Sequence, residues 1–222
     1  MGKVEKWNQP ELEPFIFNKL EPFPIGCRGS RVFCGIANHF GVSKYAITSY
    51  HPVFTYKHDP GQKIYWQEGL PNEAYLYRLG QELRIGEVFD FEGETLDCRP
   101  VIGACSAVQA GGQKCHIPML DFCIETGKES LKVIQESVLL PPGVFLNSGN
   151  SYHYYGYDLM PEREWRKWMN DLGKGDKLDE IVDGKYLEYS LERGYGALRL
   201  FGYPKTDKPK VPVVVGYANL RC

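Results

Sequence analysis

Acidic residues in the second half of the chain stand where a carboxylate could take part in chemistry. Asp121 ends the apolar segment HIPMLDF, and Asp183 follows an apolar pair in EIVDGKY. A carboxylate at the end of a buried strand binds a metal ion, accepts hydrogen bonds from backbone N–H groups or reaches solvent. If the strand continues past Asp121, its two-residue period places Cys123 and Glu125 on the same face. Metal binding and a purely structural role are both open for these acids.

The segment SGNSYHYYGY, residues 148–157, carries a hydroxyl and an imidazole at strand spacing. Ser151 and His153 are two residues apart, so an extended backbone points both side chains to one face. A hydroxyl beside an imidazole can bind a phosphate oxygen or orient a nucleophile. The alternative is a histidine that satisfies a hydrogen bond in the core. The preceding glycine and serines favour a functional site.

Arg199 interrupts the apolar segment ALRLF, and two lysines, Lys205 and Lys208, follow it in a proline-containing loop. A guanidinium among leucine and phenylalanine costs free energy unless it pairs with an acid or binds an anionic ligand. Two explanations therefore stay open: an anionic ligand, or an internal ion pair with an acid such as Asp183.

The seven cysteines do not suggest a disulfide framework, because their number is odd and no secretory signal precedes them. No CxxC pair is present, and the spacing of Cys105, Cys115 and His116 is looser than that of a usual metal site. Free thiols that pack as small hydrophobic groups are the simplest interpretation. A hydrolase that uses Cys115 or Cys123 with His153 ranks last, since no helix N-terminus is seen to activate either thiol.

Hydrophobic periodicity predicts the elements that must position these side chains. We expect helices over 71–84, 127–140, 161–172 and 178–193, and strands over 45–56, 63–67, 116–122, 144–147, 151–157, 197–201 and 212–217. The first two strands would form a hairpin around a turn at 58–61, with Pro52 indicating an edge strand. Residues 86–113 are expected to be rich in loops. From residue 116 the order strand, helix, two strands, helix, strand is typical of a small split α/β sandwich.

The composition describes an ordinary globular protein with 43% hydrophobic and 14% aromatic residues in 222. A net charge of −2 weighs against a non-specific nucleic-acid binder, although a local basic groove stays open. No apolar run approaches the roughly 20 residues of a membrane span. The first 24 residues are charged and interrupted by prolines, unlike a signal peptide. We therefore expect a cytoplasmic protein without membrane contact.

Four segments, HIPMLDFCIE, SGNSYHYY, EIVDGKY and ALRLFGYPK, together resemble the archaeo-eukaryotic primase and primase-polymerase superfamily. The pattern of that family is an acid pair that closes a strand, then Ser-x-His, then a lone acid, then an arginine strand and a lysine. The resemblance implies an α+β fold with an RRM-like split α/β core of the primase-polymerase type. Residues 1–222 would form a single domain with an irregular arm (1–30), an N-terminal α/β module (31–114) and a catalytic-type core (115–222).

The resemblance also implies a site for nucleotide chemistry. Asp121 and Asp183 would be catalytic carboxylates that bind Mg²⁺ or Mn²⁺. Four side chains would contact the phosphates of the incoming nucleotide: Ser151, His153, Arg199 and Lys205. The second acid of the first motif would stand at 123, where this chain has Cys123, and a thiol is a poor ligand for Mg²⁺. Either Glu125 replaces that acid in catalysis, or one metal binds, or polymerase activity is lost.

Two functions follow from the resemblance. The first is a primase-polymerase-like nucleotidyltransferase that acts on nucleic acid with nucleoside triphosphates and a divalent metal. The alternative is a catalytically inactive relative that binds nucleotide or nucleic acid within a larger DNA replication or mobile-element complex. The retained acids, histidine and arginine favour the enzyme, and Cys123 and the acidic pI of about 6.2 favour the alternative. The short chain leaves little room for an accessory domain, so protein partners are expected.

Overall fold

The fold is built from antiparallel sheets and helices in a computed structural model. It describes residues 20, 22–50, 63–82, 89–91, 94–96, 101–174, 180–201 and 211–219. Within them five helices and two main sheets form, so the predicted α+β class is confirmed. The RRM-like arrangement and the division at residues 30 and 114 stay predictions.

The larger sheet has β5 at its centre. β5 pairs with β1 along one edge and with β6 and β11 along the other, and the strand order is β10-β6-β5-β1-β2 with β11 on β5. The strands are β1 (Val42–Tyr50), β2 (Lys63–Glu68), β5 (Val101–Ala110), β6 (Gln113–His116), β10 (Met160–Pro161) and β11 (Ala197–Phe201). Nearly every residue of β5 is buried, which is the pattern of a strand covered on both faces.

The smaller sheet carries Asp121 and His153. Its order is β12-β8-β9-β7, and all its pairs are antiparallel. The strands are β7 (Met119–Asp121), β8 (Gly143–Asn147), β9 (Tyr152–Gly156) and β12 (Val213–Ala218). A separate short hairpin joins β3 (Phe89–Phe91) and β4 (Glu94–Leu96). Every residue of β9 is buried, so His153 lies in a strand that is packed in the core.

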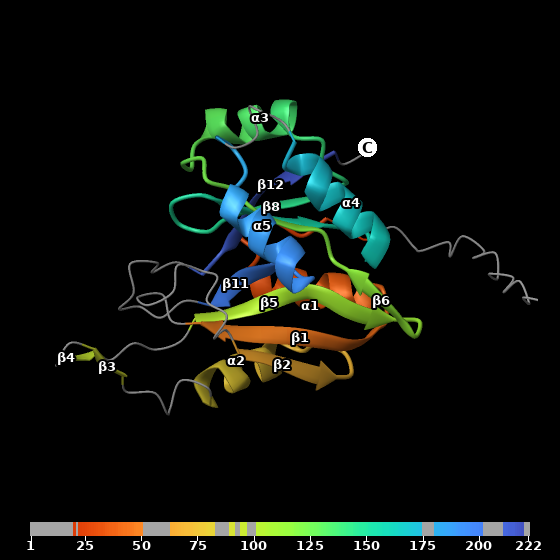
Figure 1. Cartoon of the computed structure of the whole chain (residues 1–222), viewed down its shortest axis with the longest axis vertical. Coiled ribbons are helices and arrows are strands. Elements are labelled where there is room, and N and C mark those ends of the chain that lie inside the picture. The colour runs from red at the N-terminus through yellow and green to blue at the C-terminus, as the bar shows by residue number, and fades with distance from the viewer. Residues whose placement is uncertain are drawn as a thin grey trace, which may run out of the picture.

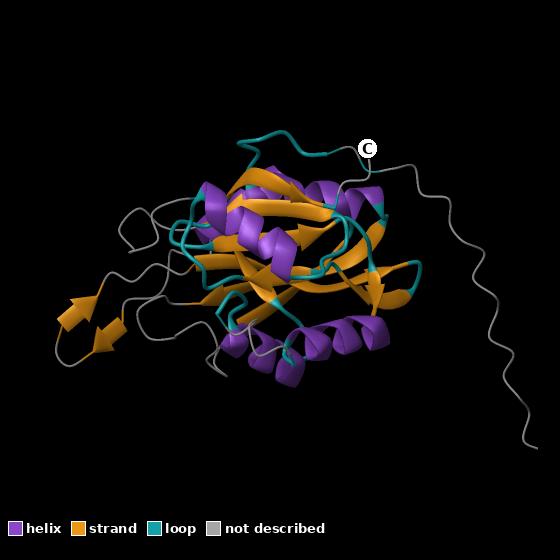
Figure 2. Cartoon of the chain, turned by 90° about the horizontal axis from the view of Figure 1, so that it is seen from above, coloured by secondary structure: helices purple, strands orange, loops and turns teal. Residues whose placement is uncertain are grey.

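Helices lie on opposite sides of the stacked sheets. They are α1 (Gly29–His39), α2 (Glu73–Glu82), α3 (Lys128–Ser137), α4 (Glu162–Leu172) and α5 (Gly184–Arg193). α4 and α5 lie in front of the sheets in Figure 1 and α1 behind them, and Figure 2 shows the same sides from above. In α4, Trp165, Met169 and Leu172 are buried at helical spacing, so this face packs into the core. None of the helices in the described residues is long and apolar enough to cross a membrane.

Several element predictions need correction. Residues 101–110, expected in a loop-rich stretch, form the central strand β5. The strand expected over 116–122 is two strands, β6 and β7, because Ile117 and Pro118 separate them. The helix expected from residue 178 begins only at Gly184, although residues 175–179 lie outside the described part.

The beginning of the chain also differs from expectation. α1 was not predicted, and it starts inside the expected arm of residues 1–30, of which 1–19 lie outside the described residues. The predicted hairpin is confirmed, because β1 and β2 pair antiparallel. β1 is not an edge strand, since β5 occupies its other side. Pro52 and the expected turn at 58–61 lie outside the described residues.

Candidate functional site

Asp121 is the last residue of β7 and has a potential partner on each side. His153 stands directly opposite it in the β7–β9 pair. On the other side, Phe122 bridges Val182, and the backbone N–H of Asp183 donates to the carbonyl oxygen of Asp121 at 3.0 Å. Directly opposed residues of antiparallel strands project to the same face. His153, Asp121 and Asp183 therefore form a row across three neighbouring segments, here called the acid–histidine row.

Two of the three members of the row are buried. Asp121 and His153 are each 5% exposed, and the Oδ1 atom of Asp121 lies 3.8 Å from the Nε2 atom of His153. Taking a carboxylate out of water costs several kcal/mol unless charges or hydrogen bonds compensate. A carboxylate and an imidazole at this distance stabilise each other when the imidazole is protonated. Groups of this kind, kept buried together, mark candidate functional sites.

Tyr186 of α5 forms part of the wall beside Asp121. Its hydroxyl donates to the carbonyl oxygen of Met119 at 3.1 Å. Burial, followed by the nearby negative charge of Asp121, holds the pKa of Tyr186 well above its usual value. The phenol thus stays protonated and holds the first residue of β7. The sequence alone gave no signal for this residue, because it reads as an ordinary core position of a helix.

Asp183 is the N-cap of α5. Its Oδ1 atom accepts a hydrogen bond from the backbone N–H of Tyr186 at 3.1 Å, and the side chain is half-buried. An aspartate cap accepts a hydrogen bond from an otherwise unbonded N–H group. Its negative charge also interacts favourably with the positive end of the helix dipole. Of the two roles that the sequence left open, the structure shows the structural one for Asp183. Its place next to Asp121 leaves the second role available.

A tight turn at residues 148–151 delivers β9 to the row. The backbone N–H and the hydroxyl of Ser148 both donate to the carbonyl oxygen of Ser151, at 3.0 and 3.1 Å. Gly149 has φ +119°, a conformation that suits glycine, and its N–H donates to Oδ1 of Asn147 at 2.8 Å. Thr126 donates to the turn through its N–H and its hydroxyl. The predicted site residue Ser151 closes this turn, two residues before His153.

Arg199 reaches this turn from the other sheet. It lies on β11, it is 3% exposed, and its Nη2 atom donates to the carbonyl oxygen of Ser148. The expectation that Arg199 binds nucleotide stays a prediction. Ser148 was not singled out from the sequence, because its role depends on a residue some 50 positions away. The other predicted phosphate contact, Lys205, lies outside the described residues.

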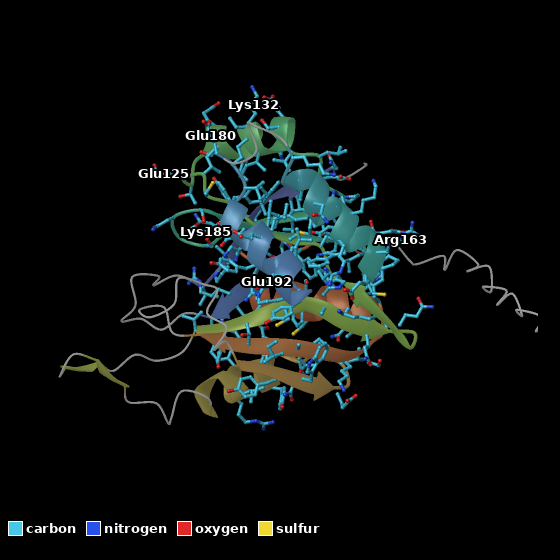
Figure 3. The ribbon with its side chains drawn as sticks, viewed as in Figure 1. Glu125, Lys132, Arg163, Glu180, Lys185 and Glu192 are labelled. Atoms are coloured by element: carbon cyan, nitrogen blue, oxygen red, sulfur yellow. The ribbon has the colours of Figure 1, made fainter. Side chains whose placement is uncertain are left out.

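Cys123 and Glu125 follow the row along the chain. The N–H of Cys123 donates to the carbonyl oxygen of Ile181 at 2.9 Å, so the extended backbone continues to this residue and its side chain is exposed. The backbone then bends at Ile124, and Glu125 is exposed beyond the bend. Figure 3 shows Glu125 and Lys185 on the same side of the view as the N-terminal end of α5. The strand that would place Asp121, Cys123 and Glu125 on one face therefore continues only as far as Cys123.

A cation site at the acid–histidine row stays a prediction. In the part of the chain that the structure describes, no group of three or more His, Cys, Asp and Glu side chains is arranged to hold a metal ion. Asp121 and Asp183 bring the oxygen ligands that Mg²⁺ and Mn²⁺ prefer to adjacent segments of one face. A thiol at position 123, in place of another carboxylate, is poorly suited to bridging a pair of such ions.

A second buried polar cluster surrounds His116. Its Nδ1 atom lies 3.1 Å from the hydroxyl of Ser106, and its Nε2 atom lies 3.5 Å from Oε2 of Glu162, too far for a strong hydrogen bond. The ring stacks on Trp165 with centroids 4.1 Å apart. Burial lowers the pKa of His116 to about 4, despite the opposing effect of Glu162. The imidazole is therefore neutral at pH 7 and acts as a core group.

Neither the loose metal site nor a thiol hydrolase that uses Cys115 gains support from the state of these thiols. Cys105 is buried, and burial raises the pKa of its thiol to about 12. Burial also raises the pKa of Cys115. A reactive cysteine needs the opposite shift, toward a thiolate at neutral pH.

Comparison with known proteins points to one family. The model of a family described as archaeo-eukaryotic primase 1D-like matches residues 86–212, more than half of the chain. The matched segment contains the whole acid–histidine row, the turn at 148–151 and Arg199. No curated protein and no solved structure matches the chain.

Proposed function

Because the chain belongs to the archaeo-eukaryotic primase 1D-like family, we propose that it is a nucleotidyltransferase of the primase-polymerase kind, acting at the acid–histidine row. The observation that carries this proposal is the register at Asp121, which has His153 opposite it on one side and Asp183 on the other. Residues that lie over 30 positions apart in the sequence thereby share one face of the sheet edge.

In this proposal each side chain has a role suited to its chemistry. Asp121 and Asp183 hold a divalent cation, Mg²⁺ or Mn²⁺, which when bound neutralises the triphosphate and the charge that develops during transfer. Ser151 and His153 contact phosphate oxygens. The backbone bonds on both sides of Asp121 fix its position before any ligand arrives, which lowers the cost of ordering the site. A role for Lys205 in binding phosphate rests on the resemblance alone.

The proposed substrates are nucleoside triphosphates and a nucleic-acid strand. The net charge of −2 gives no overall attraction to nucleic acid, so binding of a template depends on local groups or on partner proteins. An assembly for replication, including one encoded by a mobile element, is the setting in which such partners are expected.

A second candidate is a relative that binds nucleotide without catalysing transfer. The observation that favours it is the exposed Cys123, which follows Asp121 in extended backbone where a further carboxylate is expected. With two carboxylates, one of which caps a helix, the site retains a cradle for one cation and a triphosphate. It would lack the oxygen ligands that a second cation needs.

Incorporation of labelled nucleotides distinguishes these functions. Wild type, Asp121→Asn and the control Glu136→Gln, an exposed residue of α3, are compared on primed and unprimed templates with NTPs and dNTPs, in Mg²⁺ and in Mn²⁺. We expect incorporation by wild type and control, and a loss of about 100-fold or more in Asp121→Asn. Nucleotide binding by wild type without incorporation supports the second candidate. If wild type neither binds nor incorporates nucleotide, both candidate functions are wrong.

A further inference from the structure

We propose that Arg199 is a positioning residue, which sets the place of His153 by holding the turn at residues 148–151. The inference rests on the proposed function only in treating His153 as part of a nucleotide site. The resemblance assigned Arg199 to direct phosphate contact. The structure shows a bond from its head group to the backbone of the protein itself.

The first support is what the buried charge binds. Arg199 is 3% exposed, and a buried guanidinium is stable only when its donors find acceptors. One acceptor is the carbonyl oxygen of Ser148 in the turn between two strands of the smaller sheet, whereas β11 belongs to the larger sheet. A hydrogen bond from a charged donor is stronger than one between neutral groups. The contact therefore ties the turn of one sheet to a strand of the other.

The second support is the space beside Arg199. Gly103 of β5 is directly opposite it, and Thr48 of β1 is opposite Gly103 in turn, so the three positions share one face. A Cβ atom on Gly103 would lie 3.1 Å from Cγ2 of Thr48 and 3.0 Å from the carbonyl oxygen of Leu198. A Cβ atom at 103 would thus be tightly placed, and glycine leaves no side chain there to compete with Arg199 for the space above the sheet.

The third support is the short path from the turn to His153. Ser148 is bonded to Ser151 through its N–H and its hydroxyl, so a shift of Ser148 moves the start of β9. His153 follows two residues later and is opposite Leu146, two residues before the turn. The Leu146–His153 pair therefore lies two residues from the turn on each strand, and His153 is opposite Asp121 on its other side.

Nuclear magnetic resonance of the ligand-free protein tests this role without relying on activity. The imidazole ¹⁵N and ¹H signals of His153 are recorded in wild type, Arg199→Met, Arg199→Lys and the control Arg163→Met, an exposed arginine of α4 shown in Figure 3. We expect the His153 signals to shift or broaden in Arg199→Met, with partial recovery in Arg199→Lys. The His116 signals should stay in place, and the control should match wild type.

Titration with a nucleoside triphosphate completes the test. We expect Arg199→Met to weaken its affinity by about 10-fold to 100-fold. Unchanged His153 signals with weakened nucleotide binding would overturn the proposal, because Arg199 would then act as a direct ligand contact. Shifted His153 signals with unchanged nucleotide affinity would support the positioning role and count against the proposed function. If the Met variant does not fold, Arg199→Lys carries the measurement. If neither folds, Arg199 serves the whole fold and the specific role is wrong.

Discussion

A single carboxyl group at Asp183 combines a structural task with a proposed chemical one. The carboxylate caps α5, and the backbone N–H of Asp183 donates to the carbonyl oxygen of Asp121. The start of the helix and the edge of the sheet are therefore joined at one residue. The two tasks differ in what they require. A cap needs only an acceptor oxygen, whereas a hard cation gains from the negative charge.

Substitution at Asp183 separates the two tasks. Asp183→Asn keeps an acceptor for the N–H of Tyr186, so we expect its stability to stay within about 0.5 kcal/mol of wild type. Asp183→Ala should cost about 1 kcal/mol through loss of the cap. The proposed cation site predicts that Mn²⁺ raises the melting temperature of wild type. Both variants should lose that rise, because the charge is gone. A full Mn²⁺ effect in Asp183→Asn would show that this residue is a cap alone.

His116 gives the stability of the protein a dependence on pH. Its pKa is about 4 in the folded state and about 6.5 when exposed. Between these values the unfolded chain binds more protons, so the stability is complete above pH 6.5 and falls as the pH drops toward 4. Burial alone would raise the pKa of Glu162, but bonds from Lys114 and Arg166 lower it to about 2, so its contribution is lost only below about 4.5.

Denaturant unfolding at several pH values tests this dependence. From pH 7 to pH 5 we expect wild type to lose about 2 kcal/mol of unfolding free energy through His116. His116→Phe keeps a ring stacked on Trp165 but has no proton to gain, so its curve should be flatter over that range. Equal slopes in the two proteins would show that His116 does not set the dependence.

At the scale of elements, the smaller sheet depends on a close approach at the start of β8. Gly143 is opposite Gly156 in the β8–β9 pair. A Cβ atom on Gly143 would overlap the carbonyl oxygen of Tyr155 and the ring of Tyr154. Backbone atoms of a central strand cannot move aside cheaply, so this position accepts only glycine.

Gly143→Ala should therefore destabilise the protein by about 2 kcal/mol or more. The matched control is Gly184→Ala in the first turn of α5, because a Cβ atom there would meet nothing within 4 Å. We expect the control to stay within about 0.5 kcal/mol of wild type. Thermal melting of both variants checks the difference, and similar losses would mean that β8 and β9 can separate at little cost.

The elements that could be predicted were those with a clear periodic pattern. α4 has its apolar residues at helical spacing, and β1 and β2 are rich in aromatic and β-branched residues, so their types were read correctly. The sequence of β5, VIGACSAVQA, does not predict a strand because it is rich in small residues, and burial on both faces removes the alternation that marks a strand. α1 was missed because it begins at Gly29, its N-cap Arg28 makes no side-chain cap, and Gly35 interrupts it.

The candidate site was predictable only in part for a similar reason. Asp121, His153 and Asp183 stand at strand or helix ends, where local sequence already suggests a polar role. Their alignment in one row depends on the pairing of three segments, which no local pattern reports. The bond from Arg199 to Ser148 joins two sheets, so it required the tertiary structure.

At the scale of the molecule, the two sheets are not independent units. β11 lies between segments that contribute to the smaller sheet, yet it pairs with β5 of the larger one. The hydroxyl of Ser106 on β5 also accepts a bond from the N–H of Gly196, just before β11. The predicted catalytic-type core from residue 115 onward thus lacks the strand that β11 needs.

A fragment of residues 115–222 should consequently fail to fold cooperatively. Without β5, one edge of β11 has no partner. The buried Arg199 then also loses the neighbouring strand opposite it. We expect no cooperative thermal transition by circular dichroism and little protection of β9 amides from hydrogen exchange, with the full chain as the reference. A sharp transition in the fragment would show that residues 115–222 are autonomous.

The long separation between β5 and β11 also has a consequence during synthesis. Gly196 is 90 residues beyond Ser106, so at ribosomal speeds of about 5–20 residues per second β11 emerges roughly 5–20 s after β5. During that delay, the edge of β5 that pairs with β11 has no partner in the nascent chain. Such an edge can pair with a neighbouring nascent chain, so the yield of folded protein should depend on chaperones that cover it.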